Sequence, residues 1–308
     1  MTTLSKKPQS SVASLPLDAT PTVGMSLTRL AIWRIRRDRL TLIAFTVLLI
    51  LTALSILAPI ISSEILQVDA NLTDPTNTFL PLGAPGHILG TDNAGRDHLA
   101  RLLFAGQISL SIAGAGALLS ISIGLTLGVI AGYYGGWVDD IVVWIVTTIN
   151  SIPGIFLLLI VFSLLSPGPV ALIIVLGIFS WTVTTRLVRG ETFSIREREY
   201  ILSARALGAQ DWRIMMMHII PNVISIMLIN LALTVGNLIL IESALSFLGI
   251  GVQPPTPTWG NMLSRAQSYF NIGPHLVIFP GLLIVITVLC LYIIGDGLRD
   301  AFDPTAVD

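Results

Sequence analysis

The side chains of this sequence offer little for catalysis. Its only two lysines, Lys6 and Lys7, stand in the polar N-terminal segment. A Walker-type phosphate-binding loop needs a lysine after a glycine-rich turn, because the ammonium group must reach the β- and γ-phosphates. No lysine here has that setting, so we expect no catalytic residue in this chain. If ATP drives the protein, another chain hydrolyses it.

Metal binding has no better support. Cys290 is the only cysteine and lies in an apolar run, so neither a disulfide framework nor paired metal-binding thiolates are expected. The four histidines, at positions 87, 98, 218 and 275, are not spaced as metal ligands. The sequence also lacks Gly-x-Ser-x-Gly and His-Glu-x-x-His motifs, which argues against a membrane-embedded hydrolase. We predict no metal and no cofactor on this chain.

Glu242 stands in or near an apolar stretch long enough to span a membrane. A carboxylate inside a bilayer is costly and is by default a candidate for function. Two roles stay open for it: structural hydrogen bonding, or a place on a substrate path. A secondary transporter would couple transport to ions through such groups, but Glu242 is the only plausible one and no inverted repeat is evident.

A second polar motif, Asp92, Arg96 and Asp97, lies in a long polar segment between the first two apolar runs. Asp92 and Asp97 are placed to cap local structure and to pair with Arg96 and Arg101. We expect a structural role for this motif, with contact to an external protein as the alternative.

These residues are set in a very apolar chain. Hydrophobic residues make up 53% of the 308 positions and charged residues 11%, and the mean hydropathy is +0.83. Soluble proteins carry roughly a quarter charged residues, so a soluble domain of this size is excluded and a polytopic membrane protein remains. Basic residues form no cluster apart from the membrane flanks, which argues against nucleic-acid binding.

Six apolar runs are long enough to cross a bilayer, which takes about 20 residues. They cover residues 40–61, 109–133, 141–165, 170–188, 222–247 and 275–294. Residues 166–169, Ser-Pro-Gly-Pro, cannot continue a helix and separate the third run from the fourth. Pro153 and Pro280 are expected to kink their helices. Gly124, Gly128 and Gly132 favour close helix packing, with a gating hinge as the alternative. The prediction is an all-α membrane protein with six transmembrane helices.

The distribution of lysine and arginine gives the orientation. Fourteen of the 17 basic residues precede the first run, separate the fourth from the fifth, or follow the sixth. Only Arg96, Arg101 and Arg265 lie on the other side. We therefore expect a multi-pass protein of the cell membrane with both termini in the cytoplasm.

Three regions follow. Residues 1–28 are expected to be a disordered cytoplasmic tail. Residues 29–107 hold the first span and the external loop that begins at residue 62. Residues 108–308 hold a five-helix core with a cytoplasmic loop at 189–221.

The cytoplasmic loop has a helical pattern of its own. Tyr200, Ala204 and Leu207 recur at i, i+4 and i+7, so they share one helix face. Gly208 suits the end of that helix, where a positive φ is tolerated, and Asp211 is placed as the N-cap of a second short helix. Such a helix pair suits docking into a groove of a partner, with a position on the lipid surface as the alternative.

The same loop resembles the EAA loop of ABC-transporter permeases, in which Glu-Ala-Ala is followed after three residues by Gly and after nine more by Ile-x-Leu-Pro. Ala204, Gly208 and Pro221 are in register with that pattern, whereas positions 202, 203, 218 and 220 depart from it. Residues 217–222, Met-His-Ile-Ile-Pro-Asn, are similar to Arg-His-Ile-Leu-Pro-Asn of the peptide/nickel branch. The resemblance implies that an ATPase docks on the loop, with these candidate residues: Glu199, Tyr200, Ala204, Leu207, Gly208, Asp211, Arg213 and Pro221.

Further motifs resemble the C-type permease of dipeptide, oligopeptide and nickel importers. They are residues 87–92 with 95–97, 131–139, 242–255, 259–263 and 295–300, and the resemblance covers about residues 29–304. One difference follows the Gly-Gly-Trp motif, where this chain has Val143, Trp144 and Thr147 in place of Met-Arg and a later Asp.

The resemblance implies the architecture of a type I ABC importer permease and a set of partners. These are a homologous second permease, one or two cytoplasmic ATPase subunits that hold ATP and Mg, and an extracytoplasmic solute-binding protein. The implied function is import of dipeptides or oligopeptides. The same machinery moving nickel chelates or oligosaccharides is the alternative.

Overall fold

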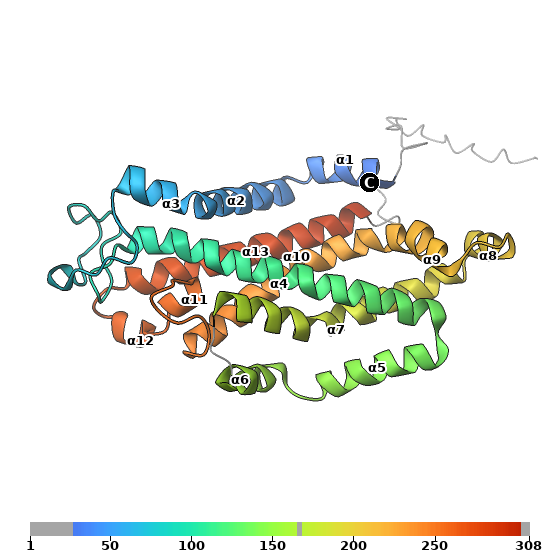
Figure 1. Ribbon diagram of the computed structural model, residues 1–308. Coiled ribbons are helices and arrows are strands. Elements are labelled where there is room, and N and C mark those ends of the chain that lie inside the picture. The colour runs from blue at the N-terminus through green and yellow to red at the C-terminus, as the bar shows by residue number, and fades with distance from the viewer. Residues whose placement is uncertain (1–26, 165–167, 303–308) are drawn as a thin grey trace, which may run out of the picture.

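The computed structural model describes residues 27–164 and 168–302, which form an elongated bundle of helices lying roughly along one axis (Figure 1). The longer helices are α1 (Leu27–Arg37), α2 (Arg39–Ile56), α4 (His98–Tyr134), α5 (Gly136–Asn150), α6 (Gly154–Leu164), α7 (Pro169–Arg196), α8 (Glu199–Ala206), α10 (Ile220–Phe247) and α13 (His275–Phe302). The short ones are α3 (Ala58–Ile60), α9 (Asp211–Ile214), α11 (Trp259–Met262) and α12 (Ala266–Tyr269). The π-helical turns η1 (Ile61–Leu66) and η3 (Met215–Ile219) and the 3₁₀ turn η2 (Pro75–Asn77) complete the elements. No β-strand forms within the described ranges, so the all-α prediction is confirmed.

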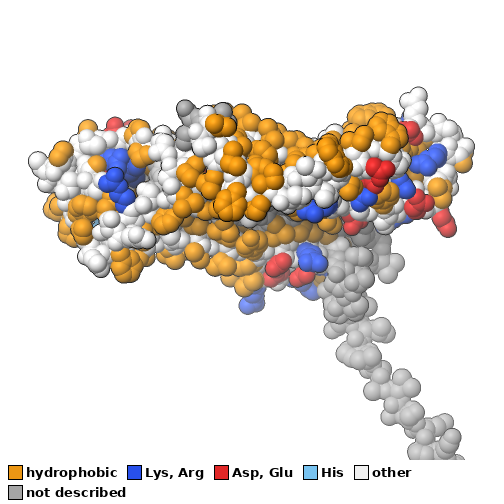
Figure 2. Space-filling view, turned by 90° about the horizontal axis from the view of Figure 1, so that it is seen from below, with side chains coloured by type: hydrophobic (Ala, Val, Ile, Leu, Met, Phe, Trp, Pro, Cys, Tyr) orange, Lys and Arg blue, Asp and Glu red, His pale blue; other side chains and the backbone are white. Residues whose placement is uncertain are grey.

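The bundle has two distinct ends. The irregular segment 67–97, α3, α11 and α12 gather at one end, here termed the α12 end, and α1, α8 and α9 gather at the other, the α8 end (Figure 1). Hydrophobic side chains dominate the middle of the face seen in Figure 2, and charged side chains lie toward its two ends and in one group along its lower edge. This is the pattern expected of helices that cross a bilayer and emerge on both sides.

Five helical stretches of the described chain are long and apolar enough to cross a membrane. They are Arg39–Ile56, His98–Tyr134, Pro169–Arg196, Asp211–Phe247 and His275–Phe302. The sixth candidate is the pair α5 and α6, which are bent by 80° at the break before Gly154. The predicted third span is therefore not one continuous helix. Pro153 lies at the break, where it cannot supply a backbone N–H to continue α5.

Several helices are longer than their apolar runs. α4 begins at His98, about ten residues before the predicted span, because the Asp97 side chain caps it by accepting the Ala100 N–H at 2.7 Å. Its 37 residues reach about 55 Å, well beyond a hydrocarbon core of about 30 Å. The predicted external loop, 62–107, thus ends near residue 97. At the α8 end, α7 extends to Arg196, so the loop predicted at 189–221 begins later than expected.

The chain also holds a helix that the sequence reading missed. α1 begins at Leu27, two residues before the end of the tail that was expected over residues 1–28. Asp38 separates α1 from α2 and caps α2 by accepting the Leu40 N–H at 3.0 Å. The hydroxyl of Thr41 donates to the same carboxylate and lowers the pKa of Asp38. The remainder of the expected disordered tail, residues 1–26, lies outside the described residues.

The most extensive helix contact joins α4 to α7, and the glycine stripe makes it possible. A Cβ atom at Gly128 would lie 2.7 Å from Cβ of Val188, and one at Gly132 would lie 2.6 Å from Cβ of Thr192. Real Cβ atoms do not approach so closely, so the two backbones can meet here only because these positions lack side chains. The structure supports the packing role of the stripe.

Candidate functional site

The helix α8 projects from the bundle and is held to it by a single buried side chain. Ile201 is fully buried against Ile214 and Ile219, which extend the apolar cluster between the ends of α4, α7 and α10. The ring of Tyr200 lies 6.2 Å from that of His218 in η3, which adds a second, half-exposed contact. α8 is therefore seated on the bundle through one face and open on the other.

The turn after α8 has the conformation expected for glycine. Gly208 has φ +84°, and no heavy atom lies within 4 Å of the place where its Cβ would stand. The N–H of Ala209 donates to the carbonyl of Ala204 at 3.1 Å, which closes the helix end. What requires glycine at this position is the backbone dihedral angle, since there is room for a side chain.

Asp211 does not cap α9 as the sequence pattern suggested. Gln210 occupies the N-cap position and makes no side-chain cap bond, and Asp211 is the first helical residue. Its carboxylate instead accepts a hydrogen bond from the hydroxyl of Tyr133 at 2.6 Å. The guanidinium of Arg205 lies over the same tyrosine ring, 5.2 Å from its centre. Tyr133 thus joins the last turn of α4 to both arms of the loop.

Two arginines of α7 secure the neighbouring elements. Arg189 forms a bidentate ion pair with Asp139 of α5, with Nη2 donating to Oδ2 at 2.6 Å. Arg196 donates from Nη1 to the carbonyl of Gly132 at 2.9 Å and so satisfies the end of α4. Helices α4, α5 and α7 are therefore coupled directly beside the loop.

The loop exposes several large hydrophobic side chains among its charged ones. Leu207 is 88% exposed at the turn and Trp212 is 67% exposed at the start of α9. The other exposed hydrophobic side chains are Tyr200, Leu202, Met216 and Met217. We term these six residues the loop face. Apolar side chains gathered on a projecting element mark a surface for a protein or a membrane.

The remaining predicted loop residues flank this face. Glu199 and Arg213 are exposed, Ala204 is half-buried, and Pro221 lies in the first turn of α10. The structure thus brings all eight candidate residues together at the α8 end.

Glu242 lies in the packed interior. It is fully buried in α10, where Ser246 donates to it at 2.7 Å and Ser109 of α4 donates at 3.3 Å. The same Ser109 hydroxyl oxygen accepts a hydrogen bond from the backbone N–H of Trp259 at 3.2 Å. These bonds tie α4, α10 and α11 together and support the structural alternative for Glu242. A place on a substrate path remains a prediction.

The motif of Asp92, Arg96 and Asp97 builds a small polar network at the α12 end. Asp92 accepts two bonds from the Arg96 guanidinium at 2.8 Å, and Nε of Arg101 lies 3.4 Å from the same oxygen. Asp97 pairs with His87, not with an arginine, at 2.8 Å. Earlier in the same segment, the side chain of Asp74 caps the 3₁₀ turn η2. Hydrogen bonds from the hydroxyl and the backbone N–H of Thr76 lower the pKa of Asp74. The predicted local pairing of Asp92 with Arg96 and Arg101 is observed.

Comparison with known families identifies the chain. Residues 124–307 match the family described as binding-protein-dependent transport system inner membrane component. The chain belongs to this family of transport permeases. Residues 26–81 also match the N-terminal transmembrane domain of oligopeptide transport permease C. The resemblance proposed from the EAA loop and the later motifs is confirmed.

Similar proteins support the same branch. The permease is 43% identical to the glutathione transport system permease protein GsiD of Pectobacterium atrosepticum over 218 residues, which are 71% of this chain and 72% of the relative. It is 34% identical to the dipeptide transport system permease protein DppC of Alkalihalophilus pseudofirmus over 281 residues, 91% of each chain. It is 39% identical to the oligopeptide transport system permease protein OppC of Haemophilus influenzae over 218 residues, 71% of this chain and 70% of the relative.

Sequence reasoning missed the residues of this permease that hold the loop to the bundle. Tyr133 and Asp139 lie inside the quoted 131–139 motif, but their partners stand 78 and 50 positions away. The motif at 131–139 therefore indicated a functionally important segment. The folded structure is needed to identify the bonds that Tyr133 and Asp139 make. His87 was likewise inside a quoted motif, without a sign that Asp97 is its partner.

Proposed function

We propose that this permease is the membrane-spanning subunit of an ATP-driven importer of peptides. The glutathione, dipeptide and oligopeptide permeases to which it is similar support this solute class. The family assignment decides against the secondary-transporter alternative. Its partners are a homologous permease, cytoplasmic ATPase subunits that hold ATP and Mg, and an extracytoplasmic solute-binding protein. The α8 end faces the cytoplasm and the α12 end faces outward, in the cell membrane, because the basic residues favour that orientation.

The observation that carries the proposal is the loop face. An ATPase subunit that closes on ATP can move the membrane domain only if it binds a rigid element of that domain. The projecting helix α8 and the adjoining turn, with exposed Leu207 and Trp212, offer such an element. Burying a leucine side chain of this kind contributes about 1.5–3 kcal/mol to association.

Movement of α8 is passed to the bundle through few contacts. Ile201 fits into the cluster between α4 and α10, and the Tyr133–Asp211 hydrogen bond fixes α9 to α4. Arg196 then links the end of α4 to α7. A shift of the loop therefore moves α4 and α7 together, and these helices make the most extensive contact in the protein. Such a motion would switch a solute path between the two permeases from outward to inward access.

The test is co-purification of the ATPase subunits with the tagged permease from cells that express the complete transporter. Leu207→Ser is expected to leave insertion unchanged, because Leu207 is exposed in the permease. It should reduce ATPase recovery about tenfold, since it removes an apolar contact that the docked ATPase would bury. Ile65→Ser is the matched control, because Ile65 is 72% exposed at the α12 end. Equal ATPase recovery with both variants would show that the loop face is not the docking site.

A further inference from the structure

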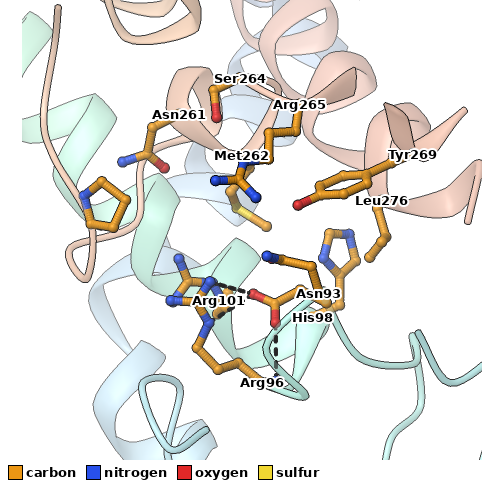
Figure 3. A pocket seen from close by; sticks show the side chains of 12 residues that line it. Asn93, Arg96, His98, Arg101, Asn261, Met262, Ser264, Arg265, Tyr269 and Leu276 are labelled. Carbon is orange, nitrogen blue, oxygen red and sulfur yellow. Dashed lines mark hydrogen bonds and ion pairs between the residues drawn. The ribbon is translucent and has the colours of Figure 1, made fainter. Parts of the chain in front are cut away.

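A cavity of about 240 Å³ opens at the α12 end, between the segment 92–101 and the turn from α11 to α12 (Figure 3). Three arginines line it: Arg96, Arg101 and Arg265. Asp92 is the only acidic residue in its wall. The described wall therefore has two formal positive charges that no carboxylate in it balances.

The two lower arginines are fixed in place. Arg96 directs Nε and Nη2 at Asp92, each at 2.8 Å. Arg101 is 4% exposed and directs Nε at Asp92, while its Nη1 lies 3.3 Å from the carbonyl oxygen of Ala70. Asp97 cannot add a counter-charge here, because its carboxylate serves His87 and the first turn of α4 and lies outside the cavity wall.

Arg265 is different. It lies on the opposite wall and is exposed, and within the described chain its side chain makes no ion pair or hydrogen bond. Figure 3 shows its guanidinium pointing into the cavity toward Asn93. A guanidinium presents a planar fork of N–H donors that matches the two oxygens of a carboxylate.

Neutral donors surround the same space. The side-chain amide of Asn93 and the hydroxyl groups of Ser264 and Tyr269 line the cavity, and the described residues supply no hydrogen-bond partner to them. His98 forms part of the lining, is 1% exposed, and has no hydrogen bond at either ring nitrogen within the described ranges. Polar groups that are buried normally have partners, and among the described wall residues His98 is the one that is buried without any. Ser264 and Arg265 are exposed and Asn93 and Tyr269 are half-buried, so their donors are open to a solute that enters the cavity.

We propose that this cavity is an outer subsite that binds the carboxylate of the solute, through Arg265 with Asn93 and Tyr269. The choice of a peptide carboxylate rests on the proposed function. The volume agrees with it, because sites for whole drug-sized ligands span roughly 300–1,000 Å³. A cavity of about 240 Å³ takes an anionic terminus and the atoms beside it.

The direct test measures binding to the full-length permease in lipid nanodiscs by saturation-transfer NMR. The probes are N-acetyl-alanyl-alanine and its C-terminal amide. The free acid is expected to bind at least about tenfold more tightly than the amide, as a charge-assisted hydrogen bond predicts. Arg265→Gln should weaken binding of the free acid by a similar factor. Arg299→Gln, at an exposed arginine in the last turn of α13, is the matched control and should leave binding unchanged.

Further variants and competitors keep the proposal falsifiable. Tyr269→Phe removes one neutral donor without changing charge and should weaken the free acid several-fold, even if Arg265→Gln proves hard to purify. Equal binding of acid and amide, or unaltered binding by Arg265→Gln, would overturn the subsite. Displacement of the free acid by inorganic phosphate as strongly as by acetate would also overturn it, in favour of a general anion site.

Uptake by cells with the complete transporter separates this proposal from the proposed function. Arg265→Gln should reduce uptake of alanyl-alanine several-fold and leave its amide unaffected. Equal loss for both solutes, with acid binding to the permease unchanged, would mean that the cavity docks a protein and would overturn the subsite. If wild-type cells take up neither solute, the peptide function fails, and the NMR measurement still decides whether the cavity binds a carboxylate.

Discussion

The two ends of the bundle are built on opposite principles. At the α12 end, the long segment 67–97 has almost no regular structure, yet its polar groups satisfy one another through Asp92, Arg96, Arg101, His87 and Asp97. At the α8 end, the loop is helical but rests on the bundle through one buried isoleucine and one tyrosine–aspartate hydrogen bond. Its other side exposes large apolar side chains among charged ones.

The segment 67–97 is thus held together by bonds within the chain, whereas the loop at the α8 end offers its exposed side chains to a partner. The buried arginine Arg101 depends on the carboxylate that it shares with Arg96, because an unpaired buried charge is costly. An exposed apolar face gains stability only when something covers it. Substitutions at the α12 end should therefore lower the stability of the permease itself, and substitutions at the α8 end should mainly affect assembly.

The largest effect is expected from Asp92→Ala. It leaves Arg101, 4% exposed, without its counter-charge, and breaking a buried ion pair in this way costs about 3–5 kcal/mol of the free energy of unfolding. The yield of monodisperse protein and the thermal unfolding temperature in detergent should both fall. Glu64→Gln, at an exposed carboxylate of the same end, is the control. An unfolding temperature equal to that of the wild type would show that the network is dispensable.

An intermediate and local effect is expected from Ile201→Ala. Truncation of this fully buried side chain should cost about 2–5 kcal/mol, and α8 has little else to hold it. Amide hydrogen exchange in residues 197–210 should become much faster while α4 and α13 stay protected. Leu202→Ala, on the exposed side of the same helix, should change nothing. Faster exchange throughout the bundle would contradict the view of α8 as a separately seated element.

The smallest effect on stability, with a large effect on function, is expected from Gly208→Val. A β-branched residue at φ +84° stores about 1–3 kcal/mol of strain, and the open surroundings add no steric clash. Membrane insertion should stay near normal while ATPase co-purification and solute uptake fall. Gly208→Asn is the matched control, because asparagine tolerates the left-handed region and should retain most of the activity. Normal uptake by the valine variant, with an intact complex, would mean that this bend does not carry the coupling.

Local signals in the sequence predicted much of this protein. Apolar runs located the five continuous spans of the described chain to within about eleven residues, since burial in lipid requires a minimum length of apolar helix. The positive φ of Gly208 and the cap formed by Asp97 were readable because each depends on neighbours within a few positions. The candidate loop residues were found together because they are consecutive in the chain.

Tertiary structure decided what depends on distant partners. Asp211 had the type and position of a helix cap, yet its carboxylate bonds to Tyr133 on another helix, because that hydroxyl competes for it once α4 and α9 are packed. The 80° bend between α5 and α6 replaced a predicted straight span. The cavity around Arg265 joins residues more than 160 positions apart, and no periodicity or local motif reports such a meeting. The sequence by itself determined which segments enter the membrane and which form turns, because the free energies of lipid burial and of turn formation depend on residues close together in the chain. The folded bundle determined which charges meet and which remain open to a ligand, because electrostatic pairing depends on distances that exist only after the helices pack.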